Sequence, residues 1–584
     1  MNKNKSYKFK IVIAGVMVTF AILLTLFRHW EISGETWGYW LFARIFAETG
    51  KFVIVDRSPL YILYLNLFRW IGYPLAVIVE YIVTSAIVAS SLIILLKRYT
   101  GLFLAVFATI LWIPFLQIAE PPVQSLALAC ICLAVAARGI KANKFRLAVS
   151  YALFICAYML RSNYLIFLFI FAIGDSIKFF RQKKTKDLIQ GLRPKLHYWP
   201  IFLVLILLLW VGTMQSPHPW NNAWFTTITW FRNSGKNLRD TSFAQALPRQ
   251  YISHKYGTFK DKDIYFIQKE IFGDANNAIE SILANPRFVI MQVARNTRSI
   301  FRVISGFTMV PPAPPNVSKS GLIYYPIALL FILFVLAIFY GALRACKSKS
   351  MLLFFIANIF FIASVTVIMP RARYLQPLIP ILILSAFWYG TQLNNILKKK
   401  KESFKIRQRL FTISSYITIL FVLIFFSNGL TGWTEIIKQV SADFQQGEIR
   451  VMERRPFSLK ASFKSVKPLV QDCNGILSFE HKFFGAFMDL PIDRFYDIWE
   501  IPPFGSFDNS SYGGLRPDRI DCVLVSNNLA TDIGSGTNSQ IRYQNYIIPY
   551  VKQMQDDGAT IYNINNYGQV IILPRALQEN KLLK

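Results

Sequence analysis

The chain has 584 residues, 54% of them apolar, with a formal net charge of +32 and a mean hydropathy of +0.38. Apolar runs of about 16 to 22 residues recur along it, which is the length that crosses a bilayer, so an ordinary soluble domain is excluded. The basic excess lies mostly in short loops between these runs. Residues 435–584, by contrast, hold 16 Lys and Arg against 17 Asp and Glu. The positive-inside rule explains this distribution, and no nucleic-acid partner is expected.

The apolar runs predict a polytopic α-helical membrane protein with about eleven transmembrane helices. The basic first ten residues lead into an apolar run with no small-residue cleavage site, so we expect an uncleaved first span. The run 147–180 is interrupted at Arg161 and has basic clusters on both sides, which favours two helices with Arg161 at the outer turn. One long helix with a buried Arg is the alternative. The expected spans are 11–27, 75–96, 102–116, 123–137, two within 147–180, 199–213, 322–343, 351–369, one ending at 396, and 410–426.

The charges of the loops predict the orientation of these spans. With the N-terminus in the cytoplasm, the cytoplasmic segments hold 27 Lys and Arg and only two acids, Asp187 and Glu402. The first outer loop, counted over 28–57, holds four bases and four acids. This asymmetry predicts a multi-pass protein with a cytoplasmic N-terminus and an extracytoplasmic C-terminal domain. No eukaryotic targeting signal is evident, so we expect a bacterial cytoplasmic membrane.

Two domains are expected. Residues 1–430 form the membrane domain, with outer loops at 28–58 and 214–320. Residues 431–584 form a small extracytoplasmic α/β domain, because β-like runs occur at 475–479 and 522–526 and a hairpin signal at 560–573. Cys473 and Cys522 fall in this domain and could pair if it faces an oxidising compartment. Acceptor binding or a lid are the roles considered for it.

The loop after the first span places a carboxylate, Glu35, a short way beyond the membrane boundary. A carboxylate at a membrane surface among aromatic rings needs a reason. An ordinary solvated acid at a helix start, where it suits the helix dipole, is the alternative. The residues that follow it are Trp37, Tyr39, Trp40, Ala43, Arg44, a turn at Gly50, and Ser58-Pro59-Leu60-Tyr61.

This loop resembles the first outer loop of the integral-membrane GT-C glycosyltransferases, such as aminoarabinose transferase and protein O-mannosyltransferase. Those loops commonly carry an acid pair, a Tyr, an Ala-containing helix, a Gly turn and Pro-Pro-Leu-Tyr. The chain departs from this pattern with Glu35 for Asp, Thr36 for the second acid and Ser58 for Pro. The resemblance covers about residues 10–430. It implies a GT-C-like transmembrane catalytic domain that transfers a sugar from a polyprenyl phosphate to a lipid, glycan or protein acceptor on the outer face, with inversion.

The resemblance also implies roles for particular residues. Glu35 is expected to be the catalytic base, which takes the acceptor proton as the new bond forms. The leaving lipid phosphate needs fixed cations, and Arg supplies planar donors for phosphate oxygens. Arg371 and Arg373 lie in Pro-Arg-Ala-Arg-Tyr-Leu-Gln-Pro, which resembles an Arg-Tyr-x-x-Pro segment of these enzymes, and are expected to bind the donor phosphate. Arg161 is a further candidate for this role, and interfacial anchoring is the alternative for all three.

Three other residues are expected to contact the substrates. Glu120, before Pro121-Pro122, resembles an acid between spans 3 and 4 of the family, where it would bind acceptor or orient an Arg. Tyr39 and Tyr374 are the tyrosines of the two motifs. The six cysteines show no metal spacing, so no cofactor or metal is predicted, although a divalent metal stays open.

Two other functions are compatible with a multi-span chain. An O-antigen polymerase or ligase would use diphosphate-linked glycans and would lack the acid-Tyr-Ala-Gly-Pro-Leu-Tyr loop. A transporter or flippase would carry paired ionisable residues at mid-membrane and internal repeats. The acidic and basic candidates gather at one face instead, which favours the transferase.

Overall fold

The computed structural model describes most of the first 182 residues, parts of 272–290 and 339–398, and much of the C-terminal region. The described residues are 3–27, 34–50, 58–116, 123–139, 146–182, 272–273, 275, 278–287, 290, 339–345, 348–368, 376–398, 433–434, 436–438, 440–442, 444–445, 459–478, 481–497, 520–526, 548–556, 558–565 and 567–573. The spans predicted at 199–213 and 410–426 lie outside these residues. So do most of the span at 322–343 and most of the outer loop 214–320, of which the short helix α13 (Ala278–Ala284) is described.

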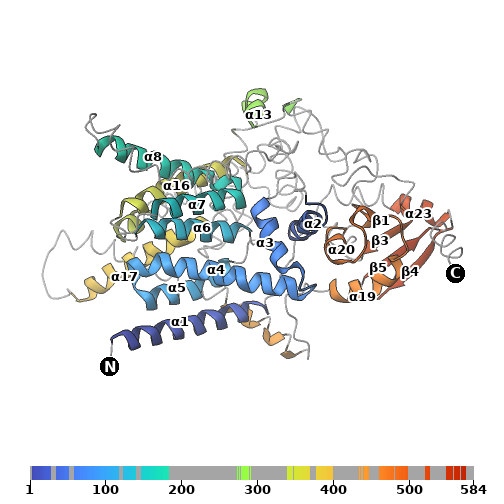
Figure 1. The fold of residues 1–584 in the computed structure, drawn as a ribbon, viewed down its shortest axis with the longest axis horizontal. Helices are drawn as coiled ribbons and strands as arrows, with labels where there is room; N and C mark the ends of the chain where they lie inside the picture. Colours follow the sequence, from blue (N-terminus) through green and yellow to red (C-terminus); the bar gives the residue numbers. More distant parts are fainter. Residues whose placement is uncertain are drawn as a thin grey trace, which may run out of the picture.

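Near-parallel helices form a helical body on one side of the molecule (Figure 1). Within it, α4 packs against α5 and α6, α6 packs against α7, and α8 packs against α16. The N-terminus lies at the end of this body that is far from the sheet (Figure 1). The body helices are α1 (Lys3–Thr25), α4 (Leu75–Thr100), α5 (Leu102–Leu116), α6 (Val123–Arg138), α7 (Arg146–Leu160), α8 (Leu165–Gln182), α16 (Lys349–Ile368) and α17 (Ile379–Lys398).

One described helix, α4, is long and apolar enough to cross a membrane by length and composition. Its last turn carries Lys97 and Arg98, which suit the negative end of a helix dipole, and Gly101 follows with φ +80°. Seven further apolar helical segments of 10–17 residues occur among the described residues. The count of eleven spans therefore stays a prediction.

The predicted break in the run 147–180 is present. Helix α7 ends at Leu160, a short 3-10 helix η1 (Ser162–Tyr164) follows, and α8 starts at Leu165. The Tyr151 hydroxyl donates to Asp175 at 2.7 Å, and the rings of Phe154 and Phe171 lie 4.6 Å apart. Residues that face each other across an antiparallel hairpin lie equally far from its turn along the chain. Both pairs are centred close to Arg161, so α7 and α8 form an antiparallel hairpin that turns there.

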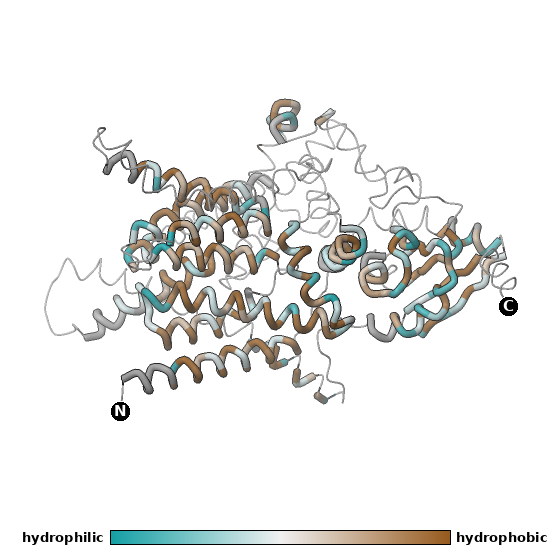
Figure 2. Tube along the Cα trace, viewed as in Figure 1, coloured by the Kyte–Doolittle hydropathy of each residue, from teal (hydrophilic) through white to brown (hydrophobic). Residues whose placement is uncertain are grey.

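The body exposes many large apolar side chains. Figure 2 shows long hydrophobic stretches on its helices and a more mixed pattern over the sheet. Soluble monomers rarely present contiguous apolar surfaces of this kind. The exposed apolar residues of α1 are Phe9, Ile11, Val12, Ile13, Val16, Met17, Phe20 and Leu23; those of α8 are Phe169, Ile173 and Ile177.

Helix α2 (Gly34–Thr49), in the predicted first outer loop, and α3 (Pro59–Arg69), which starts directly after that loop, lie between the helical body and the sheet (Figure 1). Helix α3 begins at Pro59, and the Ser58 side chain caps it by accepting from the backbone N–H of Tyr61 at 3.3 Å. Serine is a strong N-cap residue, and proline suits the first helical position. This cap gives a physical reason for a serine at position 58.

The C-terminal region contains a five-stranded sheet of order β2-β1-β3-β5-β4. Strand β1 is parallel to β2 and β3, whereas β5 is antiparallel to β3 and β4. The predicted runs at 475–479 and 522–526 and the hairpin are confirmed, and β2 was not predicted. The strands are β1 (Ile476–Ser478), β2 (Phe495–Asp497), β3 (Cys522–Ser526), β4 (Thr560–Ile564) and β5 (Gly568–Ile572).

The two faces of the sheet pack against different helices. On one face Leu477 and Val523 form a small core with Met554 of α23 (Ile548–Asp556). Alternate residues such as Ile476 and Leu524 join a larger core on the other face, together with α19 (Leu459–Val470) and α20 (His481–Phe487). Side chains of a strand alternate between faces, so each strand serves both cores. The larger core is continuous with α2 and the helical body.

Candidate functional site

Glu35 lies in the first turn of α2, which has 16 residues. The backbone there agrees with the expected helix start, but the Glu35 side chain is outside the described residues. The helix leads directly to Trp37, which is 6% exposed. The position of the proposed base is therefore set by how α2 is held.

Tyr39 is completely buried, and its ring lies edge-on to that of Tyr61 with centroids 4.9 Å apart. In this state its ring packs against a protein side chain, so its substrate-binding role stays a prediction. Its packing joins α2 to α3. Tyr39 thus has a structural role, whether or not it also binds a ligand.

An aromatic cluster connects the start of α2 to α20. The Trp37 ring lies 5.0 Å from Phe483 and 5.7 Å from Phe487, in edge-to-face arrangements. Tyr73 lies 5.2 Å from Phe483 and completes the cluster from the chain after α3. Such aromatic pairs are worth about 0.5–1.5 kcal/mol each beyond their buried area. Trp37 thus has one partner close in sequence, Tyr73, and two from the C-terminal region, Phe483 and Phe487.

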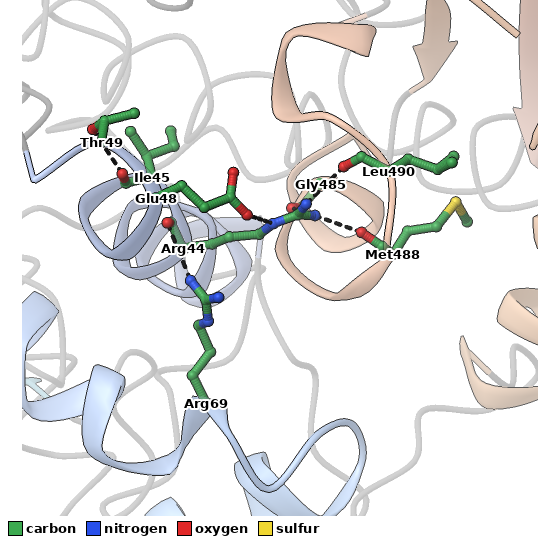
Figure 3. Close-up of polar contacts among 8 residues, drawn as sticks. All are labelled: Arg44, Ile45, Glu48, Thr49, Arg69, Gly485, Met488 and Leu490. Atoms are coloured by element: carbon green, nitrogen blue, oxygen red, sulfur yellow. Dashed lines mark hydrogen bonds and ion pairs between the residues drawn. The ribbon is translucent and has the colours of Figure 1, made fainter.

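Arg44 is the polar centre of the same contact, and its side chain reaches across to α20 (Figure 3). Its Nη1 donates to the carbonyls of Gly485 and Met488 at 2.8 and 2.5 Å, and its Nη2 donates to Leu490 at 2.7 Å. Its Nε pairs with Glu48 at 2.6 Å. The last carbonyls of a helix lack partners within it, and the guanidinium supplies a donor to one of these, that of Gly485, as well as to two carbonyls beyond the helix end. Sequence reasoning noted Arg44 without giving it a role.

A buried carboxylate, Glu80, lies near the start of α4 and was missed by the sequence analysis. Its Oε1 accepts from the Tyr61 hydroxyl at 3.3 Å and from the Thr84 hydroxyl at 2.8 Å. The Tyr64 hydroxyl lies 2.8 Å from that of Thr84. Burial, with the charge of Glu80 as a smaller cause, raises the pKa of the Tyr61 hydroxyl well above its usual value, so it stays protonated and able to donate. An acid inside a predicted span is the sequence signal that could have found this site.

Replacing Glu80 by alanine is expected to lower the free energy of unfolding by about 2 kcal/mol, because buried hydroxyls of Tyr61 and Thr84 lose their acceptor. Thermal unfolding of the purified full chain in detergent measures the change. Ser91→Ala is the matched control, since Ser91 is equally buried in α4 but donates only to the Val88 carbonyl of its own helix. Equal effects of the two substitutions would contradict the bridging role of Glu80.

Three connections of the body are next in sequence to the other predicted residues. Their described ends lie close together. Ser125, at the start of α6, donates to Gln376 Oε1 at 3.2 Å, and Gln376 opens η6 (Gln376–Leu378). The Tyr164 hydroxyl donates to the Gln124 carbonyl at 3.4 Å, which brings in the turn after Arg161. The buried side-chain amide of Gln124 has no hydrogen-bond partner in the described part of the chain. Its donor and its acceptor are therefore both available at this end of the body.

Arg161 is half-buried at the turn between α7 and η1. Glu120, Arg371, Arg373 and Tyr374 lie outside the described residues. The starts of α6 and η6 and the turn after Arg161 lie close together.

Cys473, Asp521 and Cys522 lie close enough together to suggest a metal site. The two cysteines form a disulfide, however. The Asp521 carboxylate accepts from the backbone N–H groups of Asn474 and Gly475 at 2.9 and 3.0 Å. These bonds account for the cluster without an ion, so it provides no basis for adding a metal to the predicted chemistry.

An apolar groove of about 370 Å³ lies between α1, α5 and Trp433. The Trp433 indole donates to the Ile110 carbonyl at 3.1 Å, which fixes the segment after the last predicted span against α5. The lining side chains are Met17, Phe20, Ala21, Leu24, Phe107, Ile110, Leu111 and Trp433. A lining of this kind suits hydrocarbon rather than a sugar.

Neither the protein-family models nor the curated proteins that were compared with this chain give a match.

Proposed function

We propose that the protein is an integral-membrane glycosyltransferase that moves a sugar from a polyprenyl phosphate to an acceptor hydroxyl. The observation that carries the proposal is the first outer loop, where Glu35 opens α2 and Ser58-Pro59-Leu60-Tyr61 opens α3. Both helices lie between the helical body and the sheet (Figure 1), and α3 packs against α7, whose end at Leu160 is followed by Arg161. This arrangement supports one composite site at that end of the body.

The proposed orientation puts this end outside a bacterial cytoplasmic membrane and the N-terminus inside. The exposed apolar residues of the body support membrane insertion. The disulfide between Cys473 and Cys522 supports an extracytoplasmic C-terminal domain, since such bonds persist in oxidising compartments. The opposite placement of the N-terminus and the sheet is consistent with the same topology (Figure 1).

In the proposed reaction the acceptor oxygen attacks the anomeric carbon opposite the phosphate. Glu35 takes the acceptor proton as the bond forms. The bond from the anomeric carbon to the phosphate oxygen breaks, and the polyprenyl phosphate leaves with its electron pair. Arg371, Arg373 and Arg161 balance the phosphate charge. The anomeric configuration is inverted, and Glu120, Tyr39 and Tyr374 contact the substrates.

A transporter is the second candidate, and Glu80 is the observation that favours it. An ionisable side chain inside a predicted span is a common feature of substrate or ion pathways. Among the described residues, however, Glu80 bonds to hydroxyls of Tyr61 and Thr84 rather than pairing with a cation. This pattern is better explained by a structural bridge between α3 and α4.

Deletion of the gene is expected to cause one polyprenyl-phosphate sugar to accumulate, and that lipid identifies the donor. The purified protein, reconstituted in vesicles with this lipid and an extract of acceptors, is then expected to release polyprenyl phosphate. Mass spectrometry of the lipid fraction measures the release. Movement of the intact sugar lipid across the bilayer without cleavage would support a transporter and contradict the transferase.

A further inference from the structure

The contact between α2 and α20 joins the proposed catalytic helix to the C-terminal domain. Arg44 is 8% exposed and directs three hydrogen bonds to the carbonyls of Gly485, Met488 and Leu490 (Figure 3). These carbonyls lie at and just beyond the end of α20. A planar guanidinium can serve several acceptors at fixed angles, which a lysine cannot do. Arg44 therefore sets both the distance and the rotation of α2 relative to α20.

The steric fit at this contact is equally close. A Cβ atom added at Gly485 would lie 3.0 Å from Leu41 Cδ1 and 3.6 Å from the Phe495 ring. A side chain at position 485 must therefore displace Leu41 or move α20. Glycine allows the two helices to approach until the Arg44 guanidinium reaches the carbonyls.

The contact of Arg44 with the carbonyls of Gly485, Met488 and Leu490, called the clamp below, continues to the residues beside Glu35. Trp37 packs on Phe483 and Phe487, and Trp40 lies 5.4 Å from Phe487. Trp37 is two residues beyond Glu35 on the same helix, so the backbone of the proposed base moves with it. By contrast, Arg161, Arg371 and Arg373 belong to other connections of the helical body.

We propose that Arg44 is a positioning residue for Glu35, and that the C-terminal domain is the support that holds the base in place. This inference rests on the proposed function for its catalytic part. It assigns the domain a role other than acceptor binding or a lid. Because donor-phosphate binding lies on other connections, loss of the clamp displaces the base without removing the donor site.

Arg44→Met is expected to lower kcat about 10²-fold, the effect of misplacing a reacting group by about 1 Å, while KM for the donor stays near its wild-type value. Arg44→Lys keeps the charge but not the planar set of donors and is expected to fall between Arg44→Met and wild type. Gly485→Val, which displaces Leu41 or moves α20, is expected to lower kcat in the same direction as Arg44→Met. Turnover of the identified polyprenyl-phosphate sugar by the full chain measures all three.

Arg494→Met is the matched control. Arg494 also donates to carbonyls beyond a helix end, those of Gln471 and Cys473, but within the C-terminal domain. It is expected to leave kcat near wild type. In a Glu35→Gln background, Arg44→Met is expected to add no further loss, since residues that act as a unit are not additive. An additive loss, a raised KM or an equal effect of Arg494→Met would overturn the proposal.

Hydrogen exchange separates this inference from the proposed function. Arg44→Met is expected to speed amide exchange in both α2 and α20, whereas Arg494→Met affects only the end of α19 and β1. If wild-type protein transfers no sugar, the proposed function fails, yet the exchange result still tests the clamp. Unchanged exchange in α2 of Arg44→Met would overturn the clamp, whatever the enzyme assay gives.

Discussion

Replacing Glu35 by glutamine is expected to lower the turnover of sugar transfer by about 10²- to 10⁴-fold, the contribution typical of a positioned general base. The amide keeps the size of the side chain but does not accept the acceptor proton. On the proposed function, Arg161, Arg371 and Arg373 bind the donor, so KM for the donor is expected to change little. Release of polyprenyl phosphate by the purified full chain, with the donor identified from the deletion strain, provides the measurement.

Two substitutions control for indirect effects. Glu35→Asp keeps the carboxylate, matches the residue usual in the resembled family, and is expected to retain part of the turnover. Asp556→Asn removes an exposed carboxylate from α23, which packs on the face of the sheet away from α20. It has no part in the contact between α2 and α20, so this variant is expected to stay near wild type. Wild-type turnover in Glu35→Gln would contradict the base assignment.

Replacing Cys473 and Cys522 together by serine is expected to destabilise the C-terminal domain by about 4 kcal/mol, since the disulfide closes a loop with a sequence separation of 49. Cys522 begins β3, the strand paired to both β1 and β5, and Cys473 precedes β1. The bond thus holds the residues of β1 and β3 near each other in the unfolded chain, as it does in the folded one. The midpoint of unfolding of this domain, followed by limited proteolysis of the full chain during heating, measures the effect.

A thiol reductant provides the internal control for this prediction. It is expected to lower the midpoint of the wild type to that of the double serine variant and to leave the variant unchanged. Free thiols at both positions in protein purified without reductant would contradict the bond. They would also remove one support for an extracytoplasmic domain.

Local patterns predicted several parts of the fold. The interruption at Arg161 between basic flanks predicted the turn between α7 and α8, because a helical hairpin returns the chain to the same side. The β-branched runs and the Asn/Gly turn predicted β4 and β5. Strand β2 has only three residues, Phe495–Asp497, which is too short for a clear alternation.

The contacts that define the candidate site could not be predicted in the same way. The three carbonyls to which Arg44 donates are more than 440 residues away, and no local signal connects Arg44 to α20. Glu80 could have been found as an acid inside an apolar span, but its hydroxyl partner Tyr61 belongs to a different helix. The roles of Glu120, Arg371 and Arg373 stay predictions from the sequence, because these residues lie outside the part of the chain that the structure describes.

The bonds from Arg44 to α20 also bear on how the protein is made. Gly485 follows Arg44 by 441 residues, so at typical rates of synthesis roughly 20 to 90 s pass before its carbonyl is available. Throughout that interval α2 has been synthesised, but α20, against which it packs in the finished protein, has not. On the proposed function, a ribosome that stops before α20 releases a product with every predicted active-site residue and an unsupported base. The last part of the chain to be synthesised would thus decide when the first part becomes active.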